Sequence, residues 1–197
     1  MNLPNKLSCF RMILVPILVA VWIFPYAQLN IQLPEFTFGY VSLSLKNILV
    51  LIIFVVASIT DFLDGYIARK YNLITSFGKF IDPIADKLLV NTVMIMFACN
   101  GMVPVVPVII MIWRDTIVDG LRMNTASKGV VVAAGMPGKI KTVAQMITII
   151  LVLLNNLPFE LLKFPMAEFM LWFSTLVSVA SGISYFNQMK EHILESM

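Results

Sequence analysis

The sequence has 197 residues, of which 59% are hydrophobic and only 13% are charged, and its mean hydropathy is +0.91. Ordinary soluble domains contain roughly 45–50% apolar residues, so this composition excludes a soluble globular protein. The formal net charge of +3 is too small to indicate a nucleic-acid-binding surface, and we expect no nucleic-acid partner. At about 20 apolar residues per crossing, residues 1–197 can form a single compact membrane domain.

Six apolar stretches follow one another along the chain, and each is long enough for a membrane-crossing helix. The breaks between them contain Asn, Gly and Pro, which are typical of turns. The sequence therefore predicts an all-α integral membrane bundle of six transmembrane helices. The approximate stretches are residues 11–28, 45–68, 80–100, 103–123, 139–157 and 166–187.

The basic residues are divided unequally between the two sides of this six-helix path. One side carries only Lys46 and Lys163 among the 14 Lys and Arg residues. Because cytoplasmic loops carry an excess of Lys and Arg, we expect both termini to face the cytoplasm. The residues on the side of the termini are Lys6, Arg11, Arg69, Lys70, Lys79, Lys87, Arg114, Arg122, Lys128, Lys139, Lys141 and Lys190.

Two pairs of aspartates fall in the second and third stretches, Asp61 with Asp64 and Asp82 with Asp86. A carboxylate inside a bilayer costs a few kcal/mol unless it faces water, a metal or a partner, so these residues predict a functional site. Within each helix, the two aspartates lie about 60° and about 40° apart, on one face. An antiparallel hairpin would bring Asp64 level with Asp82, and Asp61 level with Asp86, each to within about 3 Å. We therefore expect one cluster of four carboxylates near the cytoplasmic side.

Carboxylates without imidazole or thiolate partners suit hard divalent cations. We expect Mg²⁺ or Mn²⁺, with two ions per site about 3.5–4 Å apart that would hold a pyrophosphate. Gly65, Ala68 and Gly78 lie beside the acids and lack bulk, so a phosphorylated ligand can approach the backbone there. Alternatively, these small residues only allow membrane helices to pack closely. A six-helix carrier that passes a divalent cation is also compatible with four intramembrane acids.

The spacing of these residues resembles the signature of the CDP-alcohol phosphotransferase family. The pattern Asp-x2-Asp-Gly-x2-Ala-Arg-x8-Gly-x3-Asp-x3-Asp, which runs from Asp61 to Asp86, agrees with it at every defined position. Members of this family are six-helix membrane enzymes that use divalent metal and displace CMP from a CDP-linked alcohol with an acceptor hydroxyl. The resemblance implies that all four aspartates are metal ligands and that Asp86 is also the general base. It implies that the nucleotide pocket is lined by Gly65, Ala68, Arg69 and Gly78.

Residues 2–11 resemble the amino-terminal Asn-x-Pro-Asn-x-Leu-Thr-x2-Arg of a bacterial branch of this family. That branch uses CDP-diacylglycerol and sn-glycerol 3-phosphate. Ser8 replaces the usual Thr and keeps the hydroxyl. The resemblance implies that Pro4 and Asn5 contact the nucleotide and that Thr75 lies near the CDP group. An interfacial helix start with an Asn cap would explain the same segment.

A later segment resembles the same branch. Arg114 and Arg122 lie about 80° apart on their helix, so both can point into one cavity. Guanidinium groups bind phosphate in a bidentate way, and two lysines follow at the next helix start, so we predict a phosphorylated acceptor. The alternative is positive-inside topology with snorkelling side chains. The residues that would bind the acceptor phosphate are Arg114, Arg122, Lys139 and Lys141.

The sequence thus predicts a metal-dependent enzyme in a bacterial cell membrane, with its active site facing the cytoplasm. We expect it to join CDP-diacylglycerol to sn-glycerol 3-phosphate and to release CMP. The acceptor could instead be inositol phosphate or another alcohol, and the cation carrier is the alternative outside the family. We expect a homodimer and contacts with membrane lipids. Cys9 and Cys99 fall near opposite ends of their helices, so we expect no disulfide, and residues 146–197 indicate no chemistry.

Overall fold

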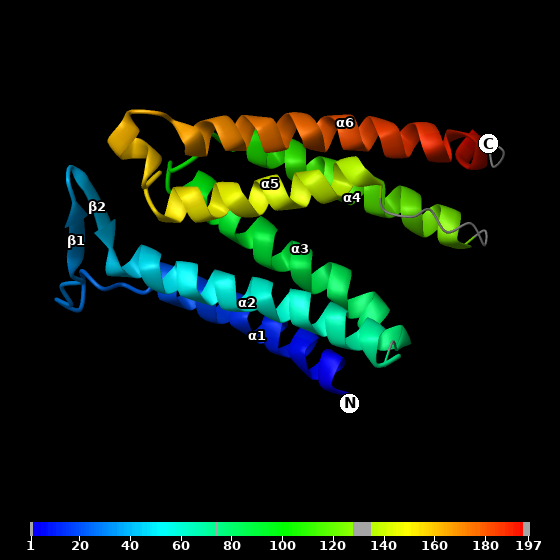
Figure 1. Cartoon of the computed structure of the whole chain (residues 1–197), viewed down its shortest axis with the longest axis horizontal. Helices are drawn as coiled ribbons and strands as arrows, with labels where there is room; N and C mark the ends of the chain where they lie inside the picture. The colour runs from blue at the N-terminus through cyan, green and yellow to red at the C-terminus, as the bar shows by residue number, and fades with distance from the viewer. Residues whose placement is uncertain (1, 74, 128–134, 195–197) are drawn as a thin grey trace. The chain divides into compact units, whose positions relative to one another are not determined.

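A computed structural model of the chain describes residues 2–73, 75–127 and 135–194. In these ranges it contains six α-helices, one two-stranded hairpin and one short 3-10 helix (Figure 1). The contacts divide the chain into two compact units: unit 1 is Met1–Met94 with Ile150–Phe164, and unit 2 is Ile95–Ile149 with Pro165–Met197. The elements are α1 (Leu3–Ile23), β1 (Glu35–Phe38), β2 (Val41–Ser44), α2 (Leu45–Lys70), α3 (Ser76–Cys99), α4 (Val105–Ser127), α5 (Met136–Leu153), η1 (Phe159–Leu162) and α6 (Met166–Leu194).

Helices α1 and α2 run antiparallel, side by side, in unit 1 (Figure 1). Their direction follows from the contacts near their two ends. Near the start of α1, the hydroxyl of Ser8 lies 3.3 Å from a carboxylate oxygen of Asp64. Near its end, the Nζ of Lys46 lies 4.7 Å from the centre of the Trp22 ring. The start of α1 therefore meets the end of α2, where the aspartates of α2 lie.

Helix α1 begins at Leu3, so the predicted start at residue 11 is wrong. The side-chain oxygen of Asn2 caps the helix by accepting a hydrogen bond from the backbone N–H of Asn5 at 3.2 Å. Pro4 fits in the first turn because the N–H groups there have no partner within the helix. The Asn cap considered as an alternative for this segment is present, and the polar first turns are helical.

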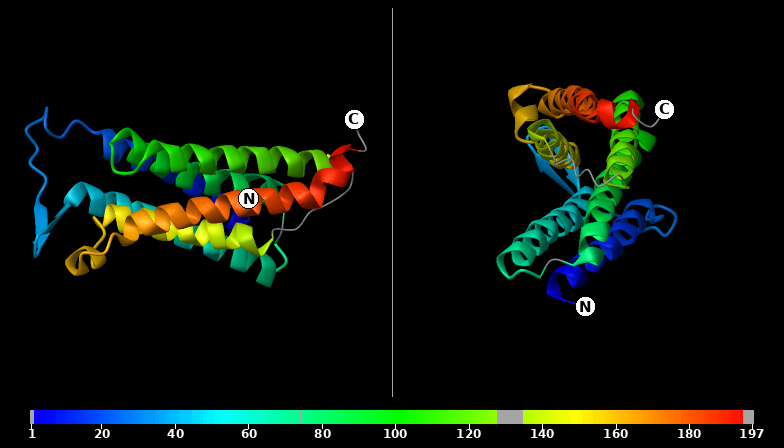
Figure 2. Two further views of the ribbon diagram at one scale, coloured as in Figure 1. Left: turned by 90° about the horizontal axis from the view of Figure 1, so that it is seen from above. Right: turned by 90° about the vertical axis from the view of Figure 1, so that its right-hand side faces the viewer.

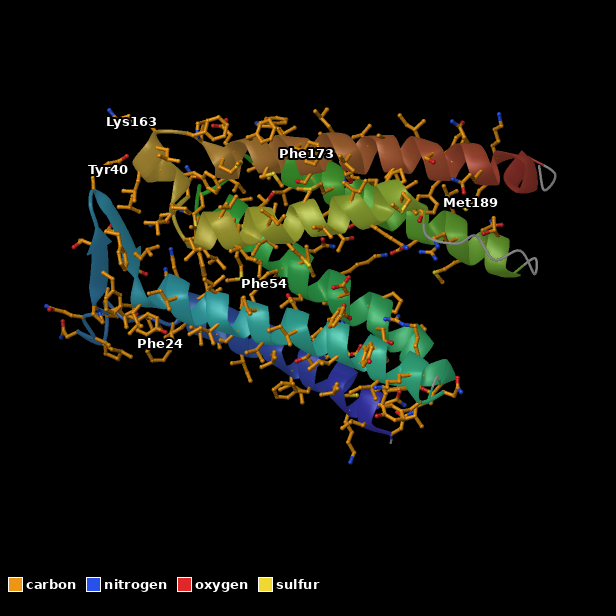
Figure 3. All side chains as sticks on the ribbon, in the orientation of Figure 1. Phe24, Tyr40, Phe54, Lys163, Phe173 and Met189 are labelled. Carbon is orange, nitrogen blue, oxygen red and sulfur yellow. The ribbon has the colours of Figure 1, made fainter. Side chains whose placement is uncertain are left out.

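A β-hairpin that the sequence did not predict precedes α2. Phe38 pairs with Val41 at its end, and Gly39 adopts a φ of 66°, which favours glycine. The hydroxyl of Tyr40 donates to the backbone oxygen of Glu160 in η1. Figure 3 shows Tyr40 at this end of unit 1. Figures 1 and 2 place the hairpin away from the N-terminus, at the end of α1 and α2 opposite the aspartates.

Helices α4 and α6 pack against each other in unit 2. Serine is small enough to let two helices approach closely, and the Oγ of Ser174 lies 3.6 Å from the Sδ of Met111 on α4. At the other end of α6, the Oγ1 of Thr125 lies 3.8 Å from the Sδ of Met189, which Figure 3 labels. The buried residues of α6 recur every three or four positions, and among them are Leu171, Ser174, Ser178, Ser181, Tyr185 and Met189.

The prediction of six helices is confirmed for the described part of the chain, and four of them, α1, α2, α5 and α6, are long and apolar enough to cross a membrane. The chain is therefore a multi-pass membrane protein. Helices α3 and α4 have 24 and 23 residues, and they carry several of the candidate acidic and basic site residues. Cys9 and Cys99 are free, as predicted. Lys128, counted above among the basic residues, lies outside the described residues.

Candidate active site

The buried face of α1 is polar in its first half and apolar in its second. Its buried residues recur at every third or fourth position, as expected for one helix face. A charged side chain is almost never fully buried without a partner, so the polar half must contact groups of opposite charge. The polar residues include Asn5, Ser8 and Arg11, and the apolar ones include Val15, Leu18 and Trp22.

Arg11 pairs with two aspartates of α2. Its Nη2 lies 2.5 Å from the Oδ2 of Asp64, and its Nη1 contacts the Oδ1 of Asp61. The side chains of Arg11 and Asp64 are 0% and 3% exposed, whereas that of Asp61 is 36% exposed. Removing one partner of a buried ion pair costs about 3–5 kcal/mol, because the other charge is left uncompensated. These three side chains therefore hold one another in place.

Ser8 connects this ion pair to α3. Its Oγ lies 2.6 Å from the Oδ1 of Asp82 and 3.3 Å from the Oδ2 of Asp64. A hydroxyl has a single proton, and the shorter distance places that proton in the hydrogen bond to Asp82. Through Ser8 and Arg11, three of the four predicted metal ligands converge on one stretch of α1.

Asp86 lies four residues after Asp82 on α3, is partly buried, and has one carboxylate oxygen shielded from solvent. The four aspartates offer only oxygen donors, which fit Mg²⁺ or Mn²⁺. Among the described residues, however, no three Asp, Glu, His or Cys side chains lie close enough together to hold a metal ion. The guanidinium of Arg11 bridges Asp61 and Asp64 instead. The donor chemistry fits a divalent cation, but the expected single cluster of four carboxylates is not formed among the described residues.

A cavity of about 290 Å³ lies beside Asp82 in unit 1. Its volume is near the lower end of the range for small-molecule sites. Its walls come from the first turns of α1, the end of α2 and the start of α3, together with Leu73 and Thr75 between α2 and α3. All seven residues predicted to surround the nucleotide line this cavity, namely Pro4, Asn5, Gly65, Ala68, Arg69, Thr75 and Gly78.

The first turn of α3 forms one wall of this cavity. The Oγ1 of Thr75 accepts a hydrogen bond from the N–H of Gly78 at 3.0 Å and donates one to the Oδ1 of Asn5 at 2.9 Å. A Cβ on Gly78 would lie 3.1 Å from that Asn5 oxygen and 3.3 Å from the Thr75 oxygen. This wall therefore has no room for a larger residue. Because a helix N-terminus carries partial positive charge, the wall is suited to an anion.

Unit 2 contains a second cluster of charged residues. Asp115 is buried on α4, where it accepts a hydrogen bond from the Nη1 of Arg114 at 2.9 Å. It accepts another from the Nζ of Lys141 on α5 at 2.6 Å. The Nη2 of Arg114 also contacts the hydroxyl of Ser181 on α6. Two of the predicted acceptor residues are thus held together by a carboxylate to which the sequence prediction gave no role.

The ring of Tyr185 lies against two of these basic residues. The Cζ atoms of Arg114 and Arg122 lie 5.5 Å and 6.0 Å from the centre of the ring. The tyrosine hydroxyl accepts a hydrogen bond from the N–H of Gly135 at 2.9 Å, just before α5 begins. Lys139, the remaining predicted residue, is exposed on α5. The sequence prediction did not include Tyr185. The residue could have been found because it follows Ser174, Ser178 and Ser181 at intervals of three or four positions, the spacing of one helix face.

Comparison with known proteins identifies the class of enzyme. Residues 1–180 match the family model described as CDP-alcohol phosphatidyltransferase, and the chain belongs to this family of transferases. It is also similar to three bacterial proteins that are each named CDP-diacylglycerol–glycerol-3-phosphate 3-phosphatidyltransferase.

The relative from Bacillus subtilis (strain 168) is 44% identical over 187 residues, which cover 95% of this chain and 94% of the relative. The relative from Rickettsia felis is 36% identical over 192 residues, 97% of each chain. The relative from Salmonella choleraesuis is 36% identical over 152 residues, which cover 75% of this chain and 74% of the relative. The family resemblance inferred from the aspartate motif is therefore confirmed.

Proposed function

We propose that this chain transfers the phosphatidyl group of CDP-diacylglycerol to sn-glycerol 3-phosphate, giving phosphatidylglycerophosphate and CMP. The relatives from Bacillus subtilis and Rickettsia felis carry the name of this activity, and they match at least 95% of the chain. The observation that carries the proposal is the cavity beside Asp82. Residues assigned to the nucleotide from the sequence motif form its walls, although they come from three helices and the turn between two of them.

The CDP group of the donor would occupy this cavity. Gly65 and Gly78 leave the backbone accessible, and the start of α3 offers its positive end to a phosphate. The guanidinium of Arg69 lies over Gly65, within 3.4 Å of where a Cβ would be, and can bind phosphate oxygens. The diacylglycerol chains would stay in the bilayer.

The transfer itself would use the aspartates of α2 and α3. We assign Asp61, Asp64, Asp82 and Asp86 as the residues that hold Mg²⁺ or Mn²⁺, two ions per site. When bound, these ions supply positive charge beside the pyrophosphate and the departing CMP. The carboxylate of Asp86 takes the proton of the acceptor's 1-hydroxyl. That hydroxyl oxygen bonds to the phosphorus that bears the diacylglycerol, and the bond from this phosphorus to the oxygen of CMP breaks.

The acceptor's phosphate would bind to the basic residues of unit 2, which are Arg114, Arg122, Lys139 and Lys141. The ion pairs support this assignment, because Arg114 and Lys141 both pair with Asp115, so that two positive charges meet one carboxylate. Arg122 adds a second guanidinium beside the same tyrosine. A phosphorylated acceptor explains this concentration of charge better than a neutral alcohol does.

The test is to incubate the detergent-purified protein with CDP-diacylglycerol, Mg²⁺ and a panel of acceptors, and to measure the release of CMP. We expect release with glycerol 3-phosphate and none with inositol, inositol phosphate or choline. Chelation of the metal and Asp82→Asn should each abolish release. The matched control is Glu168→Gln, which removes one exposed carboxylate from α6 and should leave the rate unchanged. Cation flux through proteoliposomes without CMP release would instead support the carrier.

We further propose that all six helices cross the cell membrane, with both termini and the active site on the cytoplasmic side. At 1.5 Å per residue, α3 is about 36 Å long and can span a hydrocarbon core of about 30 Å. In a variant without native cysteines, Ser127→Cys should react with an impermeant thiol reagent only after the cells are opened. Lys163→Cys is the control and should react in intact cells; the reverse pattern would overturn the orientation. The expected homodimer stays a prediction.

A further inference from the structure

Arg11 is the most deeply buried charged residue of the candidate active site. Its side chain has no exposed surface, so positive-inside topology does not explain its position on α1. It is bound to Asp61 and Asp64, but its Nε is buried without a hydrogen-bond partner. A buried guanidinium with incomplete hydrogen bonding is costly to maintain, which points to a role beyond helix packing.

The two carboxylates that bind Arg11 are two of the four proposed metal ligands. Asp82, a third proposed ligand, lies close by, because its Oδ1 and the Oδ2 of Asp64 lie 2.6 Å and 3.3 Å from the Oγ of Ser8. Neighbouring carboxylates repel one another, and a cation between them offsets the repulsion. In the described residues, Arg11 supplies a cation that contacts two of the three.

We propose that Arg11 is an internal counter-ion, which holds Asp61 and Asp64 together in the metal-free protein and competes with a divalent cation for them. This inference rests on the proposed metal site. A positive guanidinium in direct contact with the same carboxylates opposes a second cation there. Arg11 therefore keeps the site assembled before metal binds, and it weakens metal binding. In this respect it is a positioning residue that acts through Asp61 and Asp64.

The test measures metal binding without substrate. Binding of Mn²⁺ to the detergent-purified chain can be followed from the electron paramagnetic resonance signal of the free ion. We expect Arg11→Met to lower the dissociation constant for Mn²⁺ at least about tenfold, because the competing charge is removed. Arg11→Lys, which keeps the charge but cannot bridge both carboxylates, should lower it by less. Lys6→Met is the control, since it removes an exposed charge from the same helix and should leave the constant unchanged.

Thermal unfolding provides a second measurement. Without metal, Arg11→Met should unfold at a lower temperature than the wild type, and saturating Mn²⁺ should raise its midpoint by more than it raises that of the wild type. A helix-packing role alone predicts the lower midpoint but no tighter metal binding. The two effects together therefore distinguish a counter-ion from a purely structural residue.

The outcomes separate this inference from the proposed function. If the wild type binds Mn²⁺ and Arg11→Met binds it equally or more weakly, Arg11 is not a competitor and the inference is wrong. If Arg11→Met cannot be purified, Arg11→Gln removes the same charge but keeps hydrogen-bond donors, and an unchanged dissociation constant in Arg11→Gln shows in the same way that Arg11 does not compete. If neither the wild type nor any Arg11 variant binds Mn²⁺, the metal assignment fails, and the inference fails with it.

Discussion

Replacing Gly182 with alanine would press a methyl group against Arg114 without changing any charge. Gly182 lies on α6, and a Cβ built there would lie 3.1 Å from the Cγ of Arg114 and 4.0 Å from its Nε. Arg114 cannot easily turn away, because its Nη1 is bound to Asp115 at 2.9 Å and its Nη2 contacts Ser181. The stem of the arginine must therefore shift by a few tenths of an ångström and carry the guanidinium with it.

Overpacking of this kind costs about 1–3 kcal/mol. If the cost falls on binding of the acceptor's phosphate, kcat/KM for glycerol 3-phosphate should fall about 5- to 150-fold. KM for CDP-diacylglycerol should not change, since no donor residue is touched. Replacing a helical glycine by alanine favours the helix by up to about 1 kcal/mol, which offsets part of the strain, so the melting temperature should fall by less than overpacking alone would cause. The assay is the initial rate of CMP release with each substrate varied in turn.

Gly120→Ala is the matched control, because no atom lies within 4 Å of a Cβ built at Gly120 on α4. It should keep wild-type kinetics and raise the melting temperature by roughly 2–4 °C, from the helix preference alone. Equal losses of activity in both variants would refute the reasoning. A loss in Gly182→Ala that affects CDP-diacylglycerol and spares glycerol 3-phosphate would assign the basic cluster to the donor instead.

Four further predictions address the two candidate sites. Gly78→Ala crowds Asn5 at the wall of the nucleotide cavity, so titrations should show a higher KM for CDP-diacylglycerol and an unchanged KM for glycerol 3-phosphate. Asp115→Asn removes the shared counter-ion of the buried Lys141 and the partly buried Arg114, and it should cost about 3–5 kcal/mol of stability in thermal unfolding, with weaker binding of the acceptor. Tyr185→Phe should lose about 1 kcal/mol of stability, because the hydrogen bond of the hydroxyl is lost. Tyr185→Leu should also raise KM for glycerol 3-phosphate, because the cation–π contacts are lost; equal KM values in the two variants would contradict this. Arg114→Ala should lower kcat/KM for glycerol 3-phosphate about 10- to 150-fold, and Arg114→Lys should recover only part of it, since an ammonium lacks the guanidinium fork.

The placement of the aspartates on α2 and α3 was predictable because it depends on local geometry. Residues three or four positions apart lie on the same face of a helix. Asp61 and Asp64, three apart, therefore share one face of α2, and Asp82 and Asp86, four apart, share one face of α3. The short connection after Lys70 joins the end of α2 to the start of α3, and motif residues from both helices line one cavity there. The assignment of these residues to metal and nucleotide came from the family resemblance and stays a prediction.

Other features depend on how one helix meets another, which the periodicity of a single helix does not specify. The contacts of Arg11 require the register between α1 and α2, and those of Tyr185 require the face of α6 that meets α4. The hairpin before α2 has strands of only four residues each, too short to stand out beside long apolar helices. The start of α1 was missed because the helix was predicted from its run of apolar residues, and the first turns of α1 are polar.

The polar half of the buried face of α1 also affects how the chain enters the membrane. Arg11 is the ninth of the 21 residues of α1, so a lone α1 would carry an arginine near the middle of the bilayer. On the scale derived from insertion experiments, an arginine at the centre of a helix costs roughly 2.5–3.5 kcal/mol, and Asp64, nearer the end of α2, adds a smaller cost to that helix. Pairing of the two helices brings these charges into contact and offsets both costs. Each helix is apolar enough to cross a membrane, and pairing lowers the cost of the charges that both carry.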